Sequence, residues 1–266
     1  MPTALITGPT SGIGNAFAHR LAADGWDLVL VARDSVRLDR VAAELREAHG
    51  VEVETFPADL TAEAARARVA ERIADEHRPV DLLINNAGLA SPGSMLLSDY
   101  PDEDAALAVL VRAVLQLSHT ALRAMAERGH GGIVNVSSVA GYVPRGTYSA
   151  AKAYVTTFTE SLAEEARGTG VRVVVTCPGF TRTEFHARAG FETDRIPDFL
   201  WLSADKVVDD ALDALRRGRT VTVPGLQWKV IVAAAKHLPV RSITRATRKL
   251  GRQTRDQISS RTERAR

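Results

Sequence analysis

Short apolar runs alternate along the chain with longer segments of helical periodicity. The runs rich in Val, Ile and Leu occupy residues 3–7, 28–32, 51–56, 82–85, 133–136, 171–177 and 220–223. Several of them are continuously apolar, which is typical of strands that are covered on both faces of a parallel sheet. We therefore predict that these segments form the strands of one buried sheet.

The segments between the predicted strands carry apolar residues three and four positions apart. They span residues 16–23, 37–48, 62–76, 104–127 and 148–166. This spacing predicts amphipathic helices. Because strand and helix alternate, we expect right-handed crossovers and an α/β fold, with a doubly wound sheet that has helices on both faces.

The regular alternation ends near Pro224, which divides the chain into two parts. The 266 residues, 45% hydrophobic and 25% charged, have the composition of a globular protein with a sizeable core. We predict one α/β domain over residues 1–225 and a basic helical extension or tail over residues 226–266. Residues 183–202 have little periodicity and predict a loop or lid.

The sequence also excludes several kinds of site and segment. Cys177 is the single cysteine and the seven histidines show no paired spacing, so we expect no disulfide and no metal site. No charged leader precedes a long apolar stretch, and no run approaches about 18 apolar residues. We therefore expect neither a signal peptide nor a membrane-spanning helix, and we predict a cytoplasmic protein.

A glycine-rich turn follows the first predicted strand and opens the first predicted helix. Its residues are Thr7, Gly8, Pro9, Thr10, Ser11, Gly12, Ile13 and Gly14. Glycines allow a tight turn and a close approach of the backbone to a pyrophosphate, and the helix N-terminus offers free N–H groups to that anion. This context predicts a dinucleotide-binding site.

The end of the second predicted strand indicates which dinucleotide is bound. A carboxylate there would bind the 2′-hydroxyl of NAD(H), but Ala32 is followed by Arg33, which can pair with a 2′-phosphate. We therefore predict NADP(H), with NAD(H) as the alternative. Asp34 is adjacent and could neutralise Arg33, and a solvated surface arginine is the simpler interpretation.

A tyrosine and a lysine stand four residues apart in a predicted helix, which puts both side chains on one face. Tyr148 has an ordinary pKa of ~10, and the ammonium of Lys152 would stabilise its phenolate and lower that pKa. Tyr148 could then act as a general acid toward a carbonyl oxygen. Ser138 follows a strand at its carboxyl end, where a hydroxyl can bind the same oxygen.

These motifs together resemble the short-chain dehydrogenase/reductase family in its compact single-domain form. The resemblance rests on the glycine-rich turn, Asn85-Asn86-Ala87-Gly88, Ser138, Tyr148 with Lys152, and Pro178-Gly179, and it covers about residues 3–223. It implies a Rossmann-like, seven-stranded parallel sheet and an NAD(P)(H)-dependent oxidoreductase. It also implies that Ser138 orients the substrate, Tyr148 is the acid/base, and Lys152 lowers the Tyr148 pKa and binds ribose.

The resemblance also implies the remaining cofactor contacts. Asp59 and Leu60 would flank the adenine, and Asn86, Ala87 and Gly88 would support the adenosine side of the site. The stretch that borders the nicotinamide would contain Pro178, Gly179, Thr181 and Thr183, with Thr183 near the carboxamide.

Two departures from the family pattern bear on catalysis. Leu110 stands where the family often has an asparagine that orders a proton-relay water, and leucine cannot bind water. Ser138 and Tyr148 are also closer in sequence than is usual, so the intervening loop must be short. The alternative to an enzyme is therefore a cofactor-binding regulatory or scaffold protein with weakened catalysis.

The predicted lid suggests the class of substrate. It carries Phe185, Phe191, Phe199, Leu200, Trp201 and Leu202. Such a lining favours a hydrophobic carbonyl or alcohol substrate, although these side chains could instead cover the core or a subunit contact. Residues 196–201 and 223–225 are similar to a bacterial branch of the family that reduces long-chain 3-oxoacyl lipids.

The C-terminal segment differs in charge from the rest of the chain. Residues 236–266 contain ten Lys or Arg and two Asp or Glu, whereas the remainder has 24 basic and 30 acidic residues. A basic stretch next to an apolar patch could contact an anionic membrane or remain solvated. No motif for specific nucleic-acid recognition is present. The resemblance implies a homodimer or homotetramer that pairs helices 104–127 and 148–166.

Overall fold

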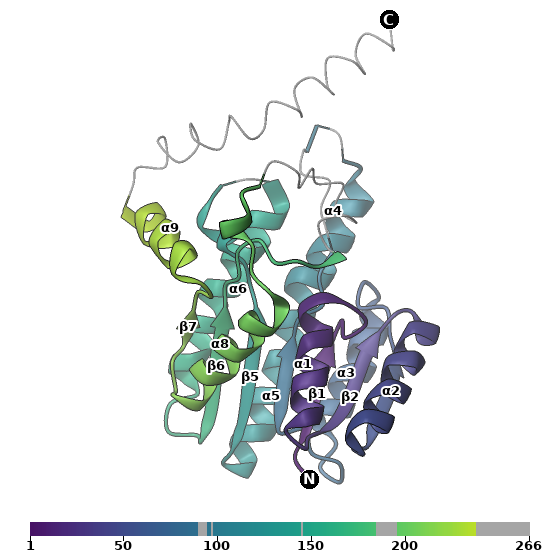
Figure 1. Ribbon diagram of the computed structural model, residues 1–266. Helices are drawn as coiled ribbons and strands as arrows, with labels where there is room; N and C mark the ends of the chain where they lie inside the picture. Colours follow the sequence, from purple (N-terminus) through teal and green to yellow (C-terminus); the bar gives the residue numbers. More distant parts are fainter. Residues whose placement is uncertain (90–94, 97, 145, 185–195, 238–266) are drawn as a thin grey trace, which may run out of the picture.

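Seven parallel strands form one sheet at the centre of the molecule. The computed structural model describes residues 1–89, 95–96, 98–144, 146–184 and 196–237 (Figure 1). The strands are β1 (Thr3–Thr7), β2 (Asp27–Ala32), β3 (Val53–Pro57), β4 (Leu82–Asn85), β5 (Gly131–Val136), β6 (Val171–Thr176) and β7 (Val221–Thr222). Their order is β3-β2-β1-β4-β5-β6-β7, which confirms the doubly wound parallel sheet.

Helices cover both faces of the sheet, as the alternation predicts. One face packs against α1 (Gly12–Ala23), α2 (Ser35–His49) and α8 (Ala204–Arg216), and the other against α3 (Glu63–Ala74), α5 (Val114–Arg128) and α6 (Gly146–Glu165). Successive strand residues point to opposite sides, so Ala4 and Ile6 join the first core and Leu5 joins the second. This is why the strands are apolar throughout.

The helix predicted over residues 104–127 is longer in the structure and is not uniform. It consists of α4 (Tyr100–Leu107), a π-helical segment (Ala108–Ala113) and α5. The continuous helix Tyr100–Arg128 has the length and apolarity of a membrane span, with a hydropathy of 1.5, but half of that window is buried inside the protein. Packing against the sheet and its neighbouring helices accounts for this hydropathy.

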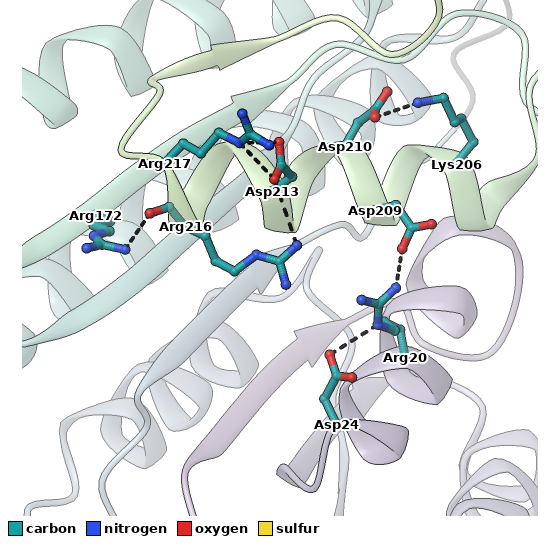
Figure 2. Close-up of polar contacts among 9 residues, drawn as sticks. All are labelled: Arg20, Asp24, Arg172, Lys206, Asp209, Asp210, Asp213, Arg216 and Arg217. Carbon is teal, nitrogen blue, oxygen red and sulfur yellow. Dashed lines mark hydrogen bonds and ion pairs between the residues drawn. The ribbon is translucent and has the colours of Figure 1, made fainter.

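Ion pairs on α8 tie it to the neighbouring elements (Figure 2). Asp209 of α8 pairs with Arg20 of α1, and Arg20 also binds Asp24 at 3.1 Å. Arg172 of β6 donates to the Arg216 carbonyl at the end of α8, at 2.8 Å. We did not predict α8 from the sequence, although Ser203 accepts a hydrogen bond from the Lys206 N–H as an N-cap.

The last described helix, α9 (Leu226–His237), packs on the domain at the carboxyl edge of the sheet (Figure 1). Trp228 is 6% exposed and Val232 is 5% exposed, and both belong to the protein core. The boundary that we place at residue 225 stays a prediction, and residues 238–266 of the predicted tail lie outside the described residues.

Candidate active site

The glycine-rich turn lies where the strand order reverses, between β1 and β4. Gly8 and Gly12 have φ angles of +69° and +59°, a left-handed conformation that favours glycine. The Gly8 N–H donates to the Val31 carbonyl at 2.8 Å, which anchors the turn on β2. Ligands of open α/β sheets bind in the crevice at such a reversal, at the carboxyl ends of the strands.

Asn86 braces this turn from the neighbouring strand. Its Nδ2 donates to the carbonyl oxygens of Thr7 and Gly8 at 3.0 and 3.1 Å. A Cβ on Gly14 would lie 2.2 Å from the Gly8 oxygen and 2.3 Å from Asn86 Nδ2, so only glycine fits there. The side chain of Asn86 therefore shapes the turn, a role that the sequence did not reveal.

The N-terminus of α1 is open to an anion. Ser11 is the N-cap residue but makes no side-chain cap hydrogen bond, whereas Asp34 and Ser203 cap α2 and α8. Thr10, Ser11 and Ile13 are half-buried around these free N–H groups. A turn that approaches closely and a helix start with no side-chain cap fit a pyrophosphate.

The segment after β6 folds back over the turn. A Cβ on Gly12 would lie 2.9 Å from Thr183 Cγ2, so Thr183 covers the glycine turn. Thr181 is buried, donates to the Gly179 carbonyl at 3.1 Å and bridges to Leu202. Thr183 therefore lies beside the turn that is predicted to bind the pyrophosphate, and its place near the carboxamide stays a prediction.

The residues predicted around the adenosine lie at the ends of β2, β3 and β4. Arg33 is exposed and forms no ion pair with another described residue, and Asp34 instead accepts a hydrogen bond from the Arg37 N–H at 3.0 Å. Within the described part of the chain, Asp34 thus forms no ion pair with Arg33 that would neutralise it. Arg37, which we did not single out, pairs with Glu184 at 3.6 Å.

Asp59 and Leu60 follow β3 and have different surroundings. Asp59 is exposed and accepts a hydrogen bond from the Thr61 N–H at 3.0 Å, whereas Leu60 is buried. The Leu60 carbonyl accepts from Arg66 at 2.9 Å, which fixes this loop. After β4, the Ala87 N–H donates to Thr7 Oγ1 at 3.0 Å. Hydrogen bonds therefore fix the backbones of both loops at this edge of the sheet.

Ser138, Tyr148 and Lys152 converge beside the end of β5. A hydrogen bond joins the Ser138 and Tyr148 side chains. Lys152 Nζ lies 5.7 Å from the centre of the Tyr148 ring and donates to the Val136 carbonyl at 2.8 Å. The helical spacing thus places the phenol and the amine on one face of α6, as predicted.

Burial sets the pKa values of these two groups. It raises the pKa of Tyr148 to about 12, and the hydrogen bond from Ser138 acts in the opposite direction. Burial also lowers the pKa of Lys152 to about 8. From the sequence we predict that Lys152 lowers the Tyr148 pKa, whereas the net shift is upward and desolvation of the phenolate is its largest cause.

Leu110 occupies the π-helical segment beside Tyr148. Its side chain is 1% exposed and packs with Ala106, Ala151 and the Tyr148 ring. A Cβ on Gly88 would lie 3.7 Å from Leu110 Cδ2, so the leucine packs against the loop that follows β4. The position therefore contributes an apolar contact and no hydrogen bond.

A buried polar network that the sequence did not reveal connects the elements around Tyr148. Asn85 Nδ2 donates to Ser118 Oγ at 3.0 Å and to Asn135 Oδ1 at 2.8 Å, and Asn135 Nδ2 donates to Thr159 Oγ1 at 2.9 Å. These residues are at most 3% exposed. The network joins β4 and β5 to α5 and to α6, the helix that carries Tyr148 and Lys152.

The short loop after Ser138 is closely packed. It contains the 3-10 helix η2 (Val139–Tyr142), and a Cβ on Gly141 would lie 2.9 Å from the Ala153 nitrogen. The Val139 N–H donates to the Pro178 carbonyl at 3.0 Å. Glycine at residue 141 lets the loop approach α6, which accommodates the short spacing between Ser138 and Tyr148.

The predicted apolar lid is divided between core and surface. Leu202 is buried, and Trp201 packs on Phe180 and under Arg182 at 5.4 Å. Phe199, in the 3-10 helix η3 (Asp198–Leu200), is 70% exposed. Phe185 and Phe191 lie outside the described residues. Leu202 thus covers the protein core, which is the alternative to a substrate lining.

Gly179 meets a side chain from α9. A Cβ on Gly179 would lie 2.0 Å from Trp228 Cε2, and Trp228 Nε1 donates to the Leu200 carbonyl at 3.0 Å. Trp228 also forms an edge contact with Phe180 at 5.5 Å. Gly179 is therefore required by long-range packing that its sequence motif alone does not show.

Comparisons with known proteins agree with this geometry. The family model for short chain dehydrogenase matches residues 2–192. Sulfoacetaldehyde reductase 2 of Chromohalobacter salexigens is 39% identical over 186 residues, which are 68% of this chain and 73% of that protein. The very-long-chain 3-oxoacyl-CoA reductase of Bos taurus is 33% identical over 188 residues, 68% of this chain and 60% of that protein.

A solved structure is similar over most of the chain. The short-chain dehydrogenase from Sphingobium yanoikuyae in complex with NADPH has a TM-score of 0.81 and 38% identity, and the match covers 89% of this chain and 94% of the other. The fold, the family match and these relatives agree. This chain belongs to the short-chain dehydrogenase/reductase family and is an oxidoreductase that uses a nicotinamide cofactor.

Proposed function

We propose that the protein is an NADP(H)-dependent reductase of hydrophobic ketones, or a dehydrogenase of the matching secondary alcohols. The observation that carries this proposal is the group of Ser138, Tyr148 and Lys152 at the same sheet edge as the uncapped start of α1. The proton donor Tyr148 and the N-terminus of α1, which can bind an anion, therefore lie at one edge of the sheet. Such an arrangement suits a reaction between a phosphate-bearing cofactor and a carbonyl group.

The residues around the turn would hold the cofactor. The glycine turn and the free N–H groups of α1 would bind the pyrophosphate, and Thr183 lies against the same turn. Asp59, Leu60 and the loop from Asn86 to Gly88 would enclose the adenosine. Lys152 would hold the nicotinamide ribose, since its amine is buried next to the Tyr148 ring.

The protein side of the reaction follows from the hydrogen bonds. Bound NADPH supplies the hydride. In the reductive direction, Ser138 would donate a hydrogen bond to the substrate oxygen, and Tyr148 would transfer its proton to that oxygen. Because burial keeps the phenol neutral, Tyr148 is protonated at neutral pH and ready to donate.

A preference for NADP(H) over NAD(H) rests on Arg33. Its guanidinium is exposed at the end of β2, no carboxylate occupies the preceding position, and Asp34 is engaged as the cap of α2. Arg33 is therefore available to bind a 2′-phosphate, with Arg37 in the first turn of α2 four residues further on.

The proposed hydrophobic substrate rests on apolar residues around Tyr148. Leu110 is buried against the Tyr148 ring, where a polar residue is usual, and Met95 Sδ accepts a hydrogen bond at 3.5 Å from Thr147, directly before Tyr148. Reduction of a long-chain 3-oxoacyl lipid is the lipid-like form of this proposal. The bovine relative is named for such a substrate, whereas the Chromohalobacter relative is named for a small anionic aldehyde.

The test is NADPH oxidation, followed by absorbance, over bulky ketones, 3-oxoacyl esters and sulfoacetaldehyde. Replacing Tyr148 by Phe removes the proton donor, so we expect turnover to fall roughly 10²–10⁴-fold. The affinity for NADPH should stay within about twofold of wild type. Tyr154→Phe, on the exposed side of the same helix, is the matched control and should be fully active.

The same experiment separates the enzyme from the alternative function. Leu110 favours a cofactor-binding regulatory or scaffold protein, because leucine has no group that binds a water molecule. That function predicts NADPH binding without turnover of any tested carbonyl. Turnover that is equal in wild type and Tyr148→Phe would contradict the proposed mechanism.

A further inference from the structure

The outward face of α9 is apolar up to His237, its last residue, which is unusual for a surface helix. Trp228 and Val232 are buried against the domain. The opposite side carries Leu226 and Val230, which are 76% and 62% exposed, and Ala233, which is also exposed. These three residues, at spacings of four and three, form one stripe that we call the outer face of α9. An amphipathic surface helix would have polar residues there.

Further exposed apolar side chains border the outer face. Gln227 Nε2 donates to the Phe199 carbonyl at 3.1 Å, which joins the start of α9 to η3, where Phe199 is 70% exposed. Ile231, on the flank of α9, is 42% exposed. A contiguous group of exposed apolar residues of this kind marks an interaction site.

Positive charge lies beside this apolar surface and in the sequence that follows it. Lys229 and Lys236 are exposed on α9. Residues 238–266 contain nine Lys or Arg and two Asp or Glu. An apolar helix face next to a strongly basic segment is complementary to acyl chains beneath anionic headgroups. Binding of nucleic acid would use only the positive charge and would leave the apolar residues of the outer face exposed.

Other side chains of α9 pack against loops of the candidate site. Lys236 Nζ lies 5.2 Å from the centre of the Tyr142 ring, in η2, the helix that follows Ser138. Trp228 is fixed against Gly179 and the Leu200 carbonyl. α9 is therefore packed against two loops that border the crevice.

We propose that the outer face of α9 and the basic segment after it bind the surface of an anionic membrane. The apolar residues would enter the headgroup region, while Lys and Arg would pair with lipid phosphates. This partner is additional to the proposed reductase activity and does not depend on it.

The test is co-sedimentation of the full-length chain with vesicles of phosphatidylcholine alone or mixed with phosphatidylglycerol. We expect binding to the mixed vesicles that falls roughly tenfold or more between 0.1 and 0.5 M salt, because screening weakens each basic contact. Val230→Glu should lower binding roughly tenfold, since it puts a charge into the apolar stripe. Val36→Glu, an equally simple change of an exposed valine on α2, should bind like wild type.

Three results would overturn the proposal. The first is equal sedimentation of wild type and Val230→Glu while both keep the same thermal unfolding temperature and ketone turnover. The second is salt-dependent binding to DNA with no binding to vesicles. The third is that the wild type forms a dimer and binds no vesicles, and that Val230→Glu dissociates this dimer. The outer face would then join two copies of the chain.

Discussion

Single residues in the candidate site have properties that their sequence motifs do not carry. Lys152 is 6% exposed, and its amine donates to the Val136 carbonyl at 2.8 Å. Because burial penalises the charged form, its pKa falls to about 8. Lys152 is therefore cationic below about pH 8 and neutral above it, within the range in which enzymes are assayed.

This titration predicts the pH dependence of the reductase. The value of kcat/KM for NADPH should be high below pH 8 and decline above it, as Lys152 loses its proton and its attraction for the cofactor. Tyr148, with a pKa of about 12, does not titrate in this range. The measurement is a profile from pH 6 to 10. Lys152→Arg keeps its charge and should show no decline; a decline in that variant as well would contradict the assignment.

Arg33 provides a second prediction at the level of one side chain. Arg33→Ala removes a charged hydrogen-bond donor from the proposed 2′-phosphate site, worth about 1.5–3 kcal/mol. We expect the ratio of kcat/KM for NADPH to that for NADH to fall at least roughly tenfold. Arg40→Ala, which changes an exposed arginine on α2, the helix that follows Arg33, is the control. An unchanged ratio would place the selection of the cofactor elsewhere.

Elements, rather than residues, hold the catalytic group in place. α6 carries Tyr148 and Lys152 and is joined to β5 by the hydrogen bond between Asn135 and Thr159. The loop that carries Gly179 is packed under α9 through Trp228. A helix from the end of the chain thus supports a loop at the predicted nicotinamide position.

This packing makes Gly179 sensitive to a single methyl group. Gly179→Ala would force Trp228 to move, and overpacking of this kind costs about 1–3 kcal/mol. We expect the unfolding temperature to fall by roughly 2–10 °C, as measured by calorimetry.

A double-mutant cycle identifies the cause of that loss. In a Trp228→Ala background the methyl group has room, so Gly179→Ala should cost clearly less than in the wild type. Additive losses in the two single variants and the double variant would show that Trp228 is not the obstacle.

At the scale of the whole molecule, the order of the strands makes the site. Because β1 lies between β2 and β4, the glycine turn, Arg33 and Asn86 meet at one edge although they are distant in sequence. Because β5 follows β4, Ser138 is delivered to the same edge. The match to a structure that contains NADPH covers 89% of the chain, so the two proteins share this fold.

The exposed sides of α5 and α6 support an assembly of the whole protein. Leu115 on α5 is 42% exposed and Tyr154 on α6 is 38% exposed, and Tyr154 stacks on Phe158 at 5.7 Å. We propose a homodimer or homotetramer that pairs these helices. Tyr154→Lys should shift the sedimentation coefficient toward that of the monomer, while Val36→Lys should not. A monomeric wild type at micromolar concentration would contradict this assembly. The cytoplasmic location stays a prediction.

Much of the fold and part of the site follow from local sequence patterns. Continuous apolar strands, with helical spacing between them, specify a sheet that is covered on both faces. Tyr148 and Lys152 share a face because four residues make about one helical turn. These features depend on neighbours in sequence, and for that reason the alternation, the glycine turn and the phenol–amine pair could be read directly.

Tertiary structure decided the properties that depend on distant neighbours. Burial, and not Lys152, sets the pKa of Tyr148, and Ser138 reaches that tyrosine through a hydrogen bond. Asn86 braces the turn, and Trp228 fixes the space at Gly179. Desolvation and close packing are set by atoms from segments that meet only when the chain folds, so a linear pattern determines which residues are available, and the packed structure determines their chemistry.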